Sequence, residues 1–363
     1  MNTLRAPEWL PSFLIPFFTL SYPTAPPAAP DSFPNASYYG VGILDGCFII
    51  TCIAAMAMLR DLTRLYISEP FARWKLTRDL NRSKRENIHV DGNGKPNGKT
   101  NGVANGNGAA HKNGSAVSKK EAKKIYRSVV RFAEQGWSAI SYTALFSLGL
   151  YVHRNVPTKV LHPRNVWLNY PNIPIAAPTK FYYLLESAFY VHQVLILNAE
   201  ARRKDHWQMM THHVITVLLM IGSYVYNLTR VGCLIMLLMD WCDVFLALAK
   251  MFRYLALSTL CDATFTFFLL SWLVTRHVLF ILAIKCAFDA RPFVHSVLEK
   301  QNSSRLIYDT FLAMLSMLQG IQLMWFWMIC RVAWRVVSGQ GAEDTRSDDE
   351  EDGENHKTEH KKD

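Results

Sequence analysis

Two histidines and two aspartates, His212, His213, Asp240 and Asp243, stand in a stretch of the sequence that is otherwise strongly apolar. An Asp at the centre of a membrane helix costs about 2.5–3.5 kcal/mol, so such residues are seldom kept there without a use. An imidazole can act as a base or a nucleophile, and a carboxylate can orient the ring and stabilise its cationic form. The pattern predicts a catalytic site. A buried polar network that fixes helix packing is the alternative, and metal binding is disfavoured because one His pair supplies few ligands.

The spacing of these four residues indicates which elements must position them. Asp240 and Asp243 are three residues apart, so they share one face of a helix. His212 and His213 begin the preceding apolar run, and the short hinge between the two runs makes the helices antiparallel neighbours. At about 1.5 Å per residue, the acids lie near mid-membrane and the histidines nearer one end. A cavity open to that end can hold all four side chains.

Other apolar runs contribute polar side chains that are candidates for substrate binding: Glu186, His192, Arg276 and His277. Arg276 and Asp240 lie at similar distances from the same end of their helices. The sequence therefore predicts that Arg276 pairs with Asp240 and orients or neutralises that acid.

Half of the 363 residues are hydrophobic, and the chain carries a formal charge of +10. Seven apolar runs predict membrane-spanning helices: Val41–Leu59, Gly136–Val152, Lys180–Leu197, Thr211–Leu228, Val231–Met251, Leu260–Phe288 and Tyr308–Trp334. The fold class is therefore an all-α polytopic membrane protein. No zinc-finger or RNA-binding signature accompanies the basic residues, which cluster beside the apolar runs, so no nucleic-acid partner is expected. The cysteines are odd in number and form no CxxC motif. This indicates reduced thiols that pack among apolar residues, without disulfides or a zinc site.

Lys and Arg residues predict the orientation of the helices. They are dense in Arg60–Arg131, and they recur after the third, fifth and seventh runs, which places these segments on the cytosolic side. The N-terminus is then lumenal and the C-terminus cytosolic. Asn35 begins a glycosylation sequon, Asn35-Ala36-Ser37, in the segment predicted to be lumenal.

Two polar segments show no regular spacing of apolar residues. Asp91–Ser118 is rich in Asn and Gly and predicts a flexible linker. The tail from Gly339 is acidic and predicts disorder, and Ser347 precedes three acidic residues as in acidophilic kinase sites. The predicted organisation is a lumenal segment (1–40), a first transmembrane helix (41–59), a basic cytosolic loop with the linker (60–131), a main membrane domain (132–335) and an acidic tail (336–363).

The stretch from His212 to Tyr254, HHVITVLLMIGSYVYNLTRVGCLIMLLMDWCDVFLALAKMFRY, resembles the longevity-assurance motif of ceramide synthases within the wider TLC domain family. The likeness extends upstream through FYYLLESAFYVHQ (Phe181–Gln193) and RKDHW (Arg203–Trp207), and downstream through TRHV (Thr275–Val278). The likeness covers roughly Ala133–Trp334, and in detail the sequence is most similar to fungal members of the family. The resemblance implies that the last six helices form a bundle around a central cavity.

The resemblance also implies a reaction. Ceramide synthases transfer a fatty acyl group from acyl-CoA to the amino group of a sphingoid base, with acyl-CoA as a substrate and no cofactor. His212 and His213 would supply the general base or the nucleophile, with Asp240 and Asp243 supporting them. The expected substrate-binding residues are Arg202, Arg203 and Lys204 for the CoA phosphates, together with Glu186, His192, Asn227, Arg230, Arg276 and His277. Positive-inside topology is the alternative explanation for the three basic residues.

The same resemblance implies a setting in the endoplasmic reticulum membrane. Membrane lipids, a small single-span regulatory subunit and a second copy of the chain are possible partners. A TLC-domain lipid sensor or transporter without acyl transfer is the competing function, and the presence of both the His pair and the two acids favours the enzyme.

Overall fold

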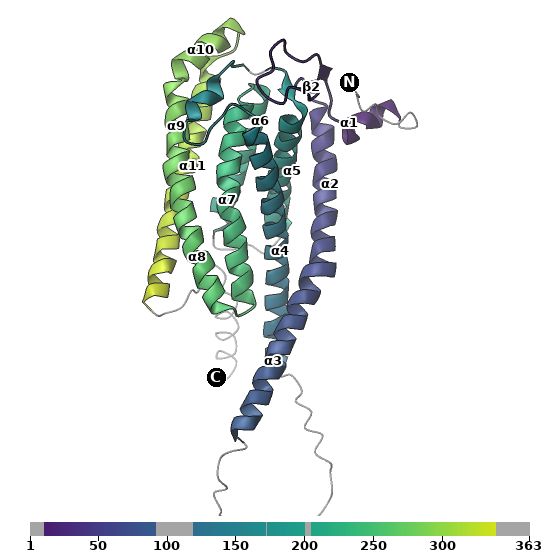
Figure 1. Ribbon diagram of the computed structural model, residues 1–363, viewed down its shortest axis with the longest axis vertical. Coiled ribbons are helices and arrows are strands. Elements are labelled where there is room, and N and C mark those ends of the chain that lie inside the picture. Colours follow the sequence, from purple (N-terminus) through teal and green to yellow (C-terminus); the bar gives the residue numbers. More distant parts are fainter. Residues whose placement is uncertain (1–10, 92–118, 172, 200–204, 339–363) are drawn as a thin grey trace, which may run out of the picture.

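Long helices that run side by side make up most of the computed structural model, which describes residues 11–91, 119–171, 173–199 and 205–338 (Figure 1). The main helices are α2 (Asp45–Leu62), α3 (Glu69–Asp91), α4 (Lys119–Arg154), α5 (Ala177–Ala199), α6 (His206–Val225), α7 (Thr229–Tyr254), α8 (Ser258–Trp272), α9 (Phe280–Asp289), α10 (Arg291–Lys300) and α11 (Arg305–Val337). The π-helical segment η2 (Thr63–Ser68) joins α2 to α3, and η4 (Leu273–Leu279) joins α8 to α9. The all-α class expected from the sequence is confirmed.

Four of these helical stretches are long and apolar enough to cross a membrane: Asp45–Lys84, Thr229–Tyr254, Ser258–Asp289 and Arg305–Arg335. Helices α4, α5 and α6 lie parallel or antiparallel to them in the same bundle (Figure 1). The chain is thus a membrane protein, and the number of seven crossings stays a prediction.

Two helices are longer than the apolar runs predicted. Helix α4 begins at Lys119, 17 residues before the predicted Gly136, and α3 occupies part of the segment expected to be a loop. The added turns are polar on one side, so a hydropathy window misses them. Their other side is apolar, because Ala72 of α3 packs against Val129 and Phe132 of α4 in a small core of their own.

Six helical columns surround the centre of the molecule. In order around the ring they are α4, α5, α6, α11, the α8–α9 column and α7, and α2 packs outside against α5. This is the bundle that the resemblance implies. The end that holds α3 and the C-terminal ends of α7 and α11 is called the basic end below, and the opposite end, near α10, the capped end (Figure 1).

Short elements close the capped end. A three-stranded antiparallel sheet joins the N-terminal segment, which also holds η1 (Ser12–Leu14) and α1 (Ile15–Phe18), to the α4–α5 connection; its strands are β1 (Pro23–Thr24), β2 (Tyr38–Tyr39) and β3 (Ile175–Ala176). Lys180 of α5 is fully buried beneath this sheet and forms an ion pair with Asp45 of α2 at 2.7 Å. The segment η3 (Pro163–Trp167) lies at the same end, where Trp167 packs against Tyr308 of α11.

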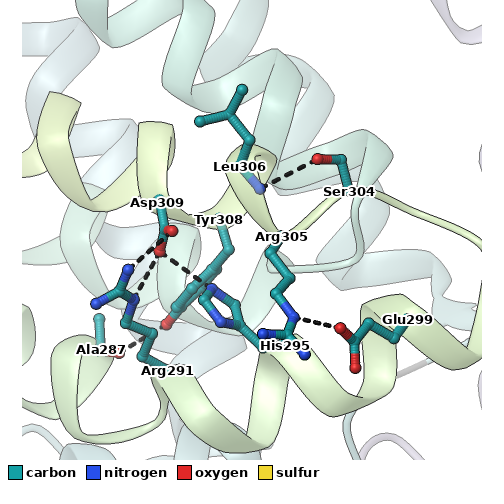
Figure 2. Close-up of polar contacts among 9 residues, drawn as sticks. All are labelled: Ala287, Arg291, His295, Glu299, Ser304, Arg305, Leu306, Tyr308 and Asp309. Carbon is teal, nitrogen blue, oxygen red and sulfur yellow. Dashed lines mark hydrogen bonds and ion pairs between the residues drawn. The ribbon is translucent and has the colours of Figure 1, made fainter.

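Polar contacts hold α10 against the start of α11 (Figure 2). Arg291 donates two hydrogen bonds to the Asp309 carboxylate, at 2.7 and 2.9 Å, and His295 Nε2 lies 3.0 Å from the same group. Tyr308 donates to the carbonyl oxygen of Ala287 at 2.8 Å. These contacts link α9, α10 and α11 at the capped end.

Candidate active site

The His pair lies on the first turns of α6, near the basic end. Helices α6 and α7 are antiparallel because the turn between them is short, and Asn227 takes a left-handed conformation there (φ 58°), which Asn tolerates better than most residues. Asp243 of α7 lines the same central cavity as His212 and His213 of α6, whereas Asp240 does not belong to its lining in the described chain. The His212 ring lies against Trp325 of α11, with ring centroids 5.0 Å apart, and the His213 ring is 6.2 Å from that of Tyr190 on α5.

Both rings line the central cavity. Their Nδ1 atoms are buried and have no hydrogen-bond partner in the part of the chain that the structure describes. Neither His is therefore held by a carboxylate here. An imidazole of this kind is available for direct contact with a molecule in the cavity.

Arg276 forms an ion pair with Asp243, not with Asp240 as predicted. Its guanidinium donates to Asp243 Oδ2 at 2.7 Å and to the Met239 carbonyl oxygen at 3.0 Å, and lies over the ring of Trp272, 4.3 Å from its centroid. The prediction counted residues along a regular α-helix. Arg276 lies in the π-helical segment η4, whose wider turn changes the direction of the side chains that follow.

Asp240 faces another acid. Its carboxyl contacts that of Glu186 on α5, and both residues are fully buried. The Glu186 carboxyl also interacts with the hydroxyl of Tyr182 on the same helix. Two carboxyl groups can share a hydrogen bond only when one of them carries a proton. Neither residue belongs to the described lining of the cavity, so the pair lies behind the wall that Tyr190 forms.

The cavity has a volume of about 470 Å³ and changes character along its length. Charged residues line it at the basic end, where five basic side chains (Arg60, Lys250, Arg253, Arg331 and Arg335) outnumber two acidic ones (Glu134 and Asp205). The His pair, Asp243 and Arg276 line its middle. Apolar side chains line the part nearer the capped end, among them Leu219, Ile235, Met236, Phe280, Phe311 and Leu315.

Other residues predicted to bind substrate lie away from this centre. Arg230 is near the capped end, where it pairs with Asp31 of the N-terminal segment and donates to the Leu168 carbonyl oxygen at 3.1 Å. His277 contacts Gln319 at 2.9 Å, and His192 lies beside Trp137. These three residues and Asn227 are absent from the cavity lining in the described part of the chain.

Three sequence predictions concern other parts of the chain. Arg202, Arg203 and Lys204 lie outside the described residues, as does Ser347. Asn35 is exposed beside the capped end. The described residues contain no group of three or more His, Cys, Asp and Glu side chains that could hold a metal.

Several lining residues were not singled out from the sequence. Tyr190 and Trp325 contact the two histidines, and Tyr142 lines the cavity near Asp243. An aromatic residue in an apolar helix is most often part of a core, so only the tertiary arrangement identifies these three. The basic residues at the end of α11 could have been noticed in the sequence, because they follow the last apolar run. The positive-inside rule explained their position equally well, so they were not predicted to line a cavity.

The cavity and its His pair within a six-column bundle define a polytopic membrane protein with a central polar site, and comparison with known proteins identifies its family. The TLC domain family matches residues 131–331, and the chain belongs to this family. The ceramide synthase FUM18 of Gibberella moniliformis is 32% identical over 354 residues, which are 88% of this chain and 72% of that protein.

Two other fungal relatives match a shorter region. The sphingosine N-acyltransferase lag1 of Schizosaccharomyces pombe is 38% identical, over 61% of this chain and 58% of its own length. The sphingosine N-acyltransferase-like protein ALT7 of Alternaria alternata is 37% identical, over 62% of this chain and 60% of its own length. The chain thus spans less than two thirds of the length of these two relatives.

Proposed function

We propose that this protein is a ceramide synthase, which transfers a fatty acyl group from acyl-CoA to the amino group of a sphingoid base. The observation that carries the proposal is the order of surfaces along the cavity: cationic at the basic end, the His pair in the middle, apolar beyond it. Acyl-CoA has the same order, with phosphates at one end, the thioester in the middle and an alkyl chain at the other end.

Helix geometry gives the scale of this match. Ten residues separate Trp325, beside His212, from Arg335, and ten separate Asp243 from Arg253 on α7, which is about 15 Å along each helix. This distance leaves room for the pantetheine arm between the thioester and the phosphates. Arg253, Arg331 and Arg335 are placed to meet phosphate groups as cations, and Arg202, Arg203 and Lys204 are proposed to add to them.

In the proposed chemistry a histidine of the pair attacks the thioester carbonyl carbon. The C–N bond to the imidazole forms as the C–S bond breaks, and CoA leaves as the thiolate and takes up a proton. The amine of the sphingoid base, after losing its own proton, attacks the same carbon, so the amide forms and the imidazole is released. In a direct route the histidine acts only as general base while both substrates are bound.

Asp243 and Arg276 have a positioning role in this scheme. Their ion pair fixes a guanidinium and a carboxylate in the cavity wall near the histidines, where they are placed to orient the reacting groups. Asp240 and Glu186 sit behind the wall and support it from there. Asn227, Arg230, His192 and His277 are proposed to act on substrates only through the helices that they hold together.

The proposed setting is the endoplasmic reticulum membrane, with the capped end lumenal and the basic end cytosolic, where acyl-CoA is found. Exposed Asn35 beside the capped end supports this orientation as a glycosylation site. We further propose that the protein binds a single-span regulatory subunit or a second copy of the chain. We also propose that Ser347 is phosphorylated.

The test is an assay of the purified chain with palmitoyl-CoA and sphinganine, with the N-acyl product detected by mass spectrometry. Product in proportion to enzyme supports the synthase. A chain that binds sphinganine tightly but forms no product, also after addition of microsomes from fungal cells that lack their own ceramide synthases, would support the lipid sensor or transporter instead.

A further inference from the structure

The cavity does not end at the His pair. On α11 its lining continues from Trp325, beside His212, to Phe311, and on α6 from His212 to Ser223. On α7 it continues from Asp243 to Gly232. Three helices of the ring therefore enclose the same inner chamber on the capped side of the histidines.

The inner chamber is uncharged. None of its lining residues in the described chain carries a formal charge, and most are apolar: Leu219, Met220, Ile235, Met236, Leu315 and Leu318. Among its polar groups, Ser223 and Tyr183 hydrogen-bond to each other, while the buried Oε1 of Gln322, close to Trp325, has no partner among the described residues. A saturated chain is the occupant that such walls favour, because most of the lining is apolar and burial of each CH₂ group against it is favourable.

The chamber is closed at its far end by aromatic side chains. Phe280 of α9 is fully buried and Phe311 of α11 nearly so. Tyr308 stacks on Phe311 with ring centroids 6.0 Å apart, and it is held in turn by its hydrogen bond to Ala287 (Figure 2). A chain that reaches Phe311 therefore meets a supported floor, and Phe280, one turn from Arg276, lies in the side wall at about the level of Leu315.

The depth of the chamber follows from helix rise. Fourteen residues from Trp325 to Phe311 span about 21 Å, and eleven from His212 to Ser223, or from Asp243 to Gly232, span about 16 Å. An extended alkyl chain with C–C bonds of about 1.5 Å advances roughly 1.3 Å per carbon. The chamber accordingly holds an extended chain of roughly 13 to 16 carbons.

We propose that Phe311 forms the floor that limits acyl chain length, with Phe280 and Leu315 in the wall one turn nearer the histidines, so that the protein selects long-chain acyl-CoA of about 14 to 16 carbons over chains of 24 or more. The inference rests on the proposed function. It adds the substrate class and the residues that determine it.

The test is a competition among acyl-CoAs of 14, 16, 18 and 24 carbons with sphinganine, and the products are separated by mass. Leu315→Phe fills the chamber one turn above the floor, and its matched control is Leu312→Phe. Both leucines are 2% exposed on α11, but only Leu315 lines the cavity. Phe311→Ala is the opposite change, which deepens the chamber.

The expected results have a defined direction. The wild type makes at least roughly tenfold more product from 16 than from 24 carbons, since one misfitted methylene in an apolar pocket already costs about tenfold or more. Leu315→Phe lowers the ratio of 18- to 14-carbon product roughly tenfold, Leu312→Phe leaves that ratio unchanged, and Phe311→Ala raises it.

A preference of the wild type for 24 carbons overturns the inference while the proposed function stands. The same holds if Leu315→Phe and Leu312→Phe give the same chain-length profile. No N-acyl product from any acyl-CoA contradicts the proposed function itself. The wild-type profile alone decides the matter if the substituted chains fail to fold.

Discussion

The guanidinium of Arg276 lies 2.7 Å from the Asp243 carboxylate, while Asp240, one turn earlier on α7, contacts Glu186 instead. The two acids of one helix face thus have different environments. Asp243 is held by a cation at the cavity wall, whereas Asp240 shares a fully buried site with another carboxyl. Residues three apart on one helix are therefore expected to respond differently to substitution.

Substitution of Arg276 by Ala should destabilise the protein and abolish most activity. Removing one partner of a buried ion pair leaves an uncompensated charge, which costs about 3–5 kcal/mol, and a displaced carboxylate costs roughly a hundredfold in rate. Thermal unfolding in detergent and N-acyl product formation measure the two effects. Arg291→Ala, whose arginine is exposed and pairs with Asp309 at the capped end, is the control and should retain activity.

A double-mutant cycle then separates the two acids. We expect coupling of about 1 kcal/mol or more between Arg276 and Asp243, and less between Arg276 and Asp240. Stronger coupling to Asp240 would contradict the pairing described here.

Glu186→Gln should fold and remain active within a fewfold of the wild type. The Gln amide can donate a hydrogen bond to Asp240, which a protonated Glu would also do. Glu186→Leu should lose most activity and stability, because it leaves the Asp240 carboxyl buried without a partner. Yield of monodisperse protein and product formation are the readouts. If Gln proves as damaging as Leu, then Glu186 acts as an ionised group and the shared-proton arrangement is wrong.

The ion pair between Lys180 and Asp45 should anchor α2 to the bundle. Lys180→Met leaves Asp45 buried and unpaired, with an expected cost of about 3–5 kcal/mol. The double variant Lys180→Met/Asp45→Asn should recover part of this loss, because Asn can still accept the hydrogen bond that Tyr224 donates to Asp45 at 2.8 Å. Unfolding temperatures of the two variants measure the recovery, and a double variant less stable than the single one would refute it.

Much of the fold could be predicted from the sequence, because apolar runs of about 20 residues have few structural solutions in a membrane. The similar depth of the His pair and Asp243 could be predicted for the same reason, since a short hinge makes α6 and α7 antiparallel, but the position of Asp240 outside the cavity lining could not. The partner of Arg276 could not, because a π-helical segment leaves no signal in a residue count. Tyr190 and Trp325 were missed because aromatic residues that pack in a core and those that line a cavity look alike in sequence.

The ion pair of Asp31 with Arg230 should make the stability of the capped end depend on pH. Partial burial of the Asp31 carboxyl raises its pKa, but hydrogen bonds from Arg230 and Asn169 outweigh this and lower the pKa from its usual 3.8. A pKa lower in the folded than in the unfolded chain gives stability above the unfolded value that is lost as the pH falls through the folded one. Asp31→Asn should therefore lower stability at neutral pH, by about 1 kcal/mol or less.

The wild type and Asp31→Asn should converge as the pH falls through the lowered pKa of the folded Asp31 carboxyl. Unfolding temperatures of both chains across this range test the prediction. A constant difference between them at every pH would mean that the charge of Asp31 contributes nothing.

Single-turnover release of CoA thiol tests the central claim, that the His pair performs the acyl transfer, most directly. Purified protein is mixed with palmitoyl-CoA without sphinganine, then with it, and thiol and N-acyl product are followed together for the wild type and for His212→Ala/His213→Ala. The account predicts a burst of thiol from the wild type before sphinganine is added, amide product afterwards, and neither from the variant. Thiol release only after sphinganine is added would replace the covalent route by the direct one. Equal product from the wild type and the variant would contradict the claim that the histidines carry the chemistry.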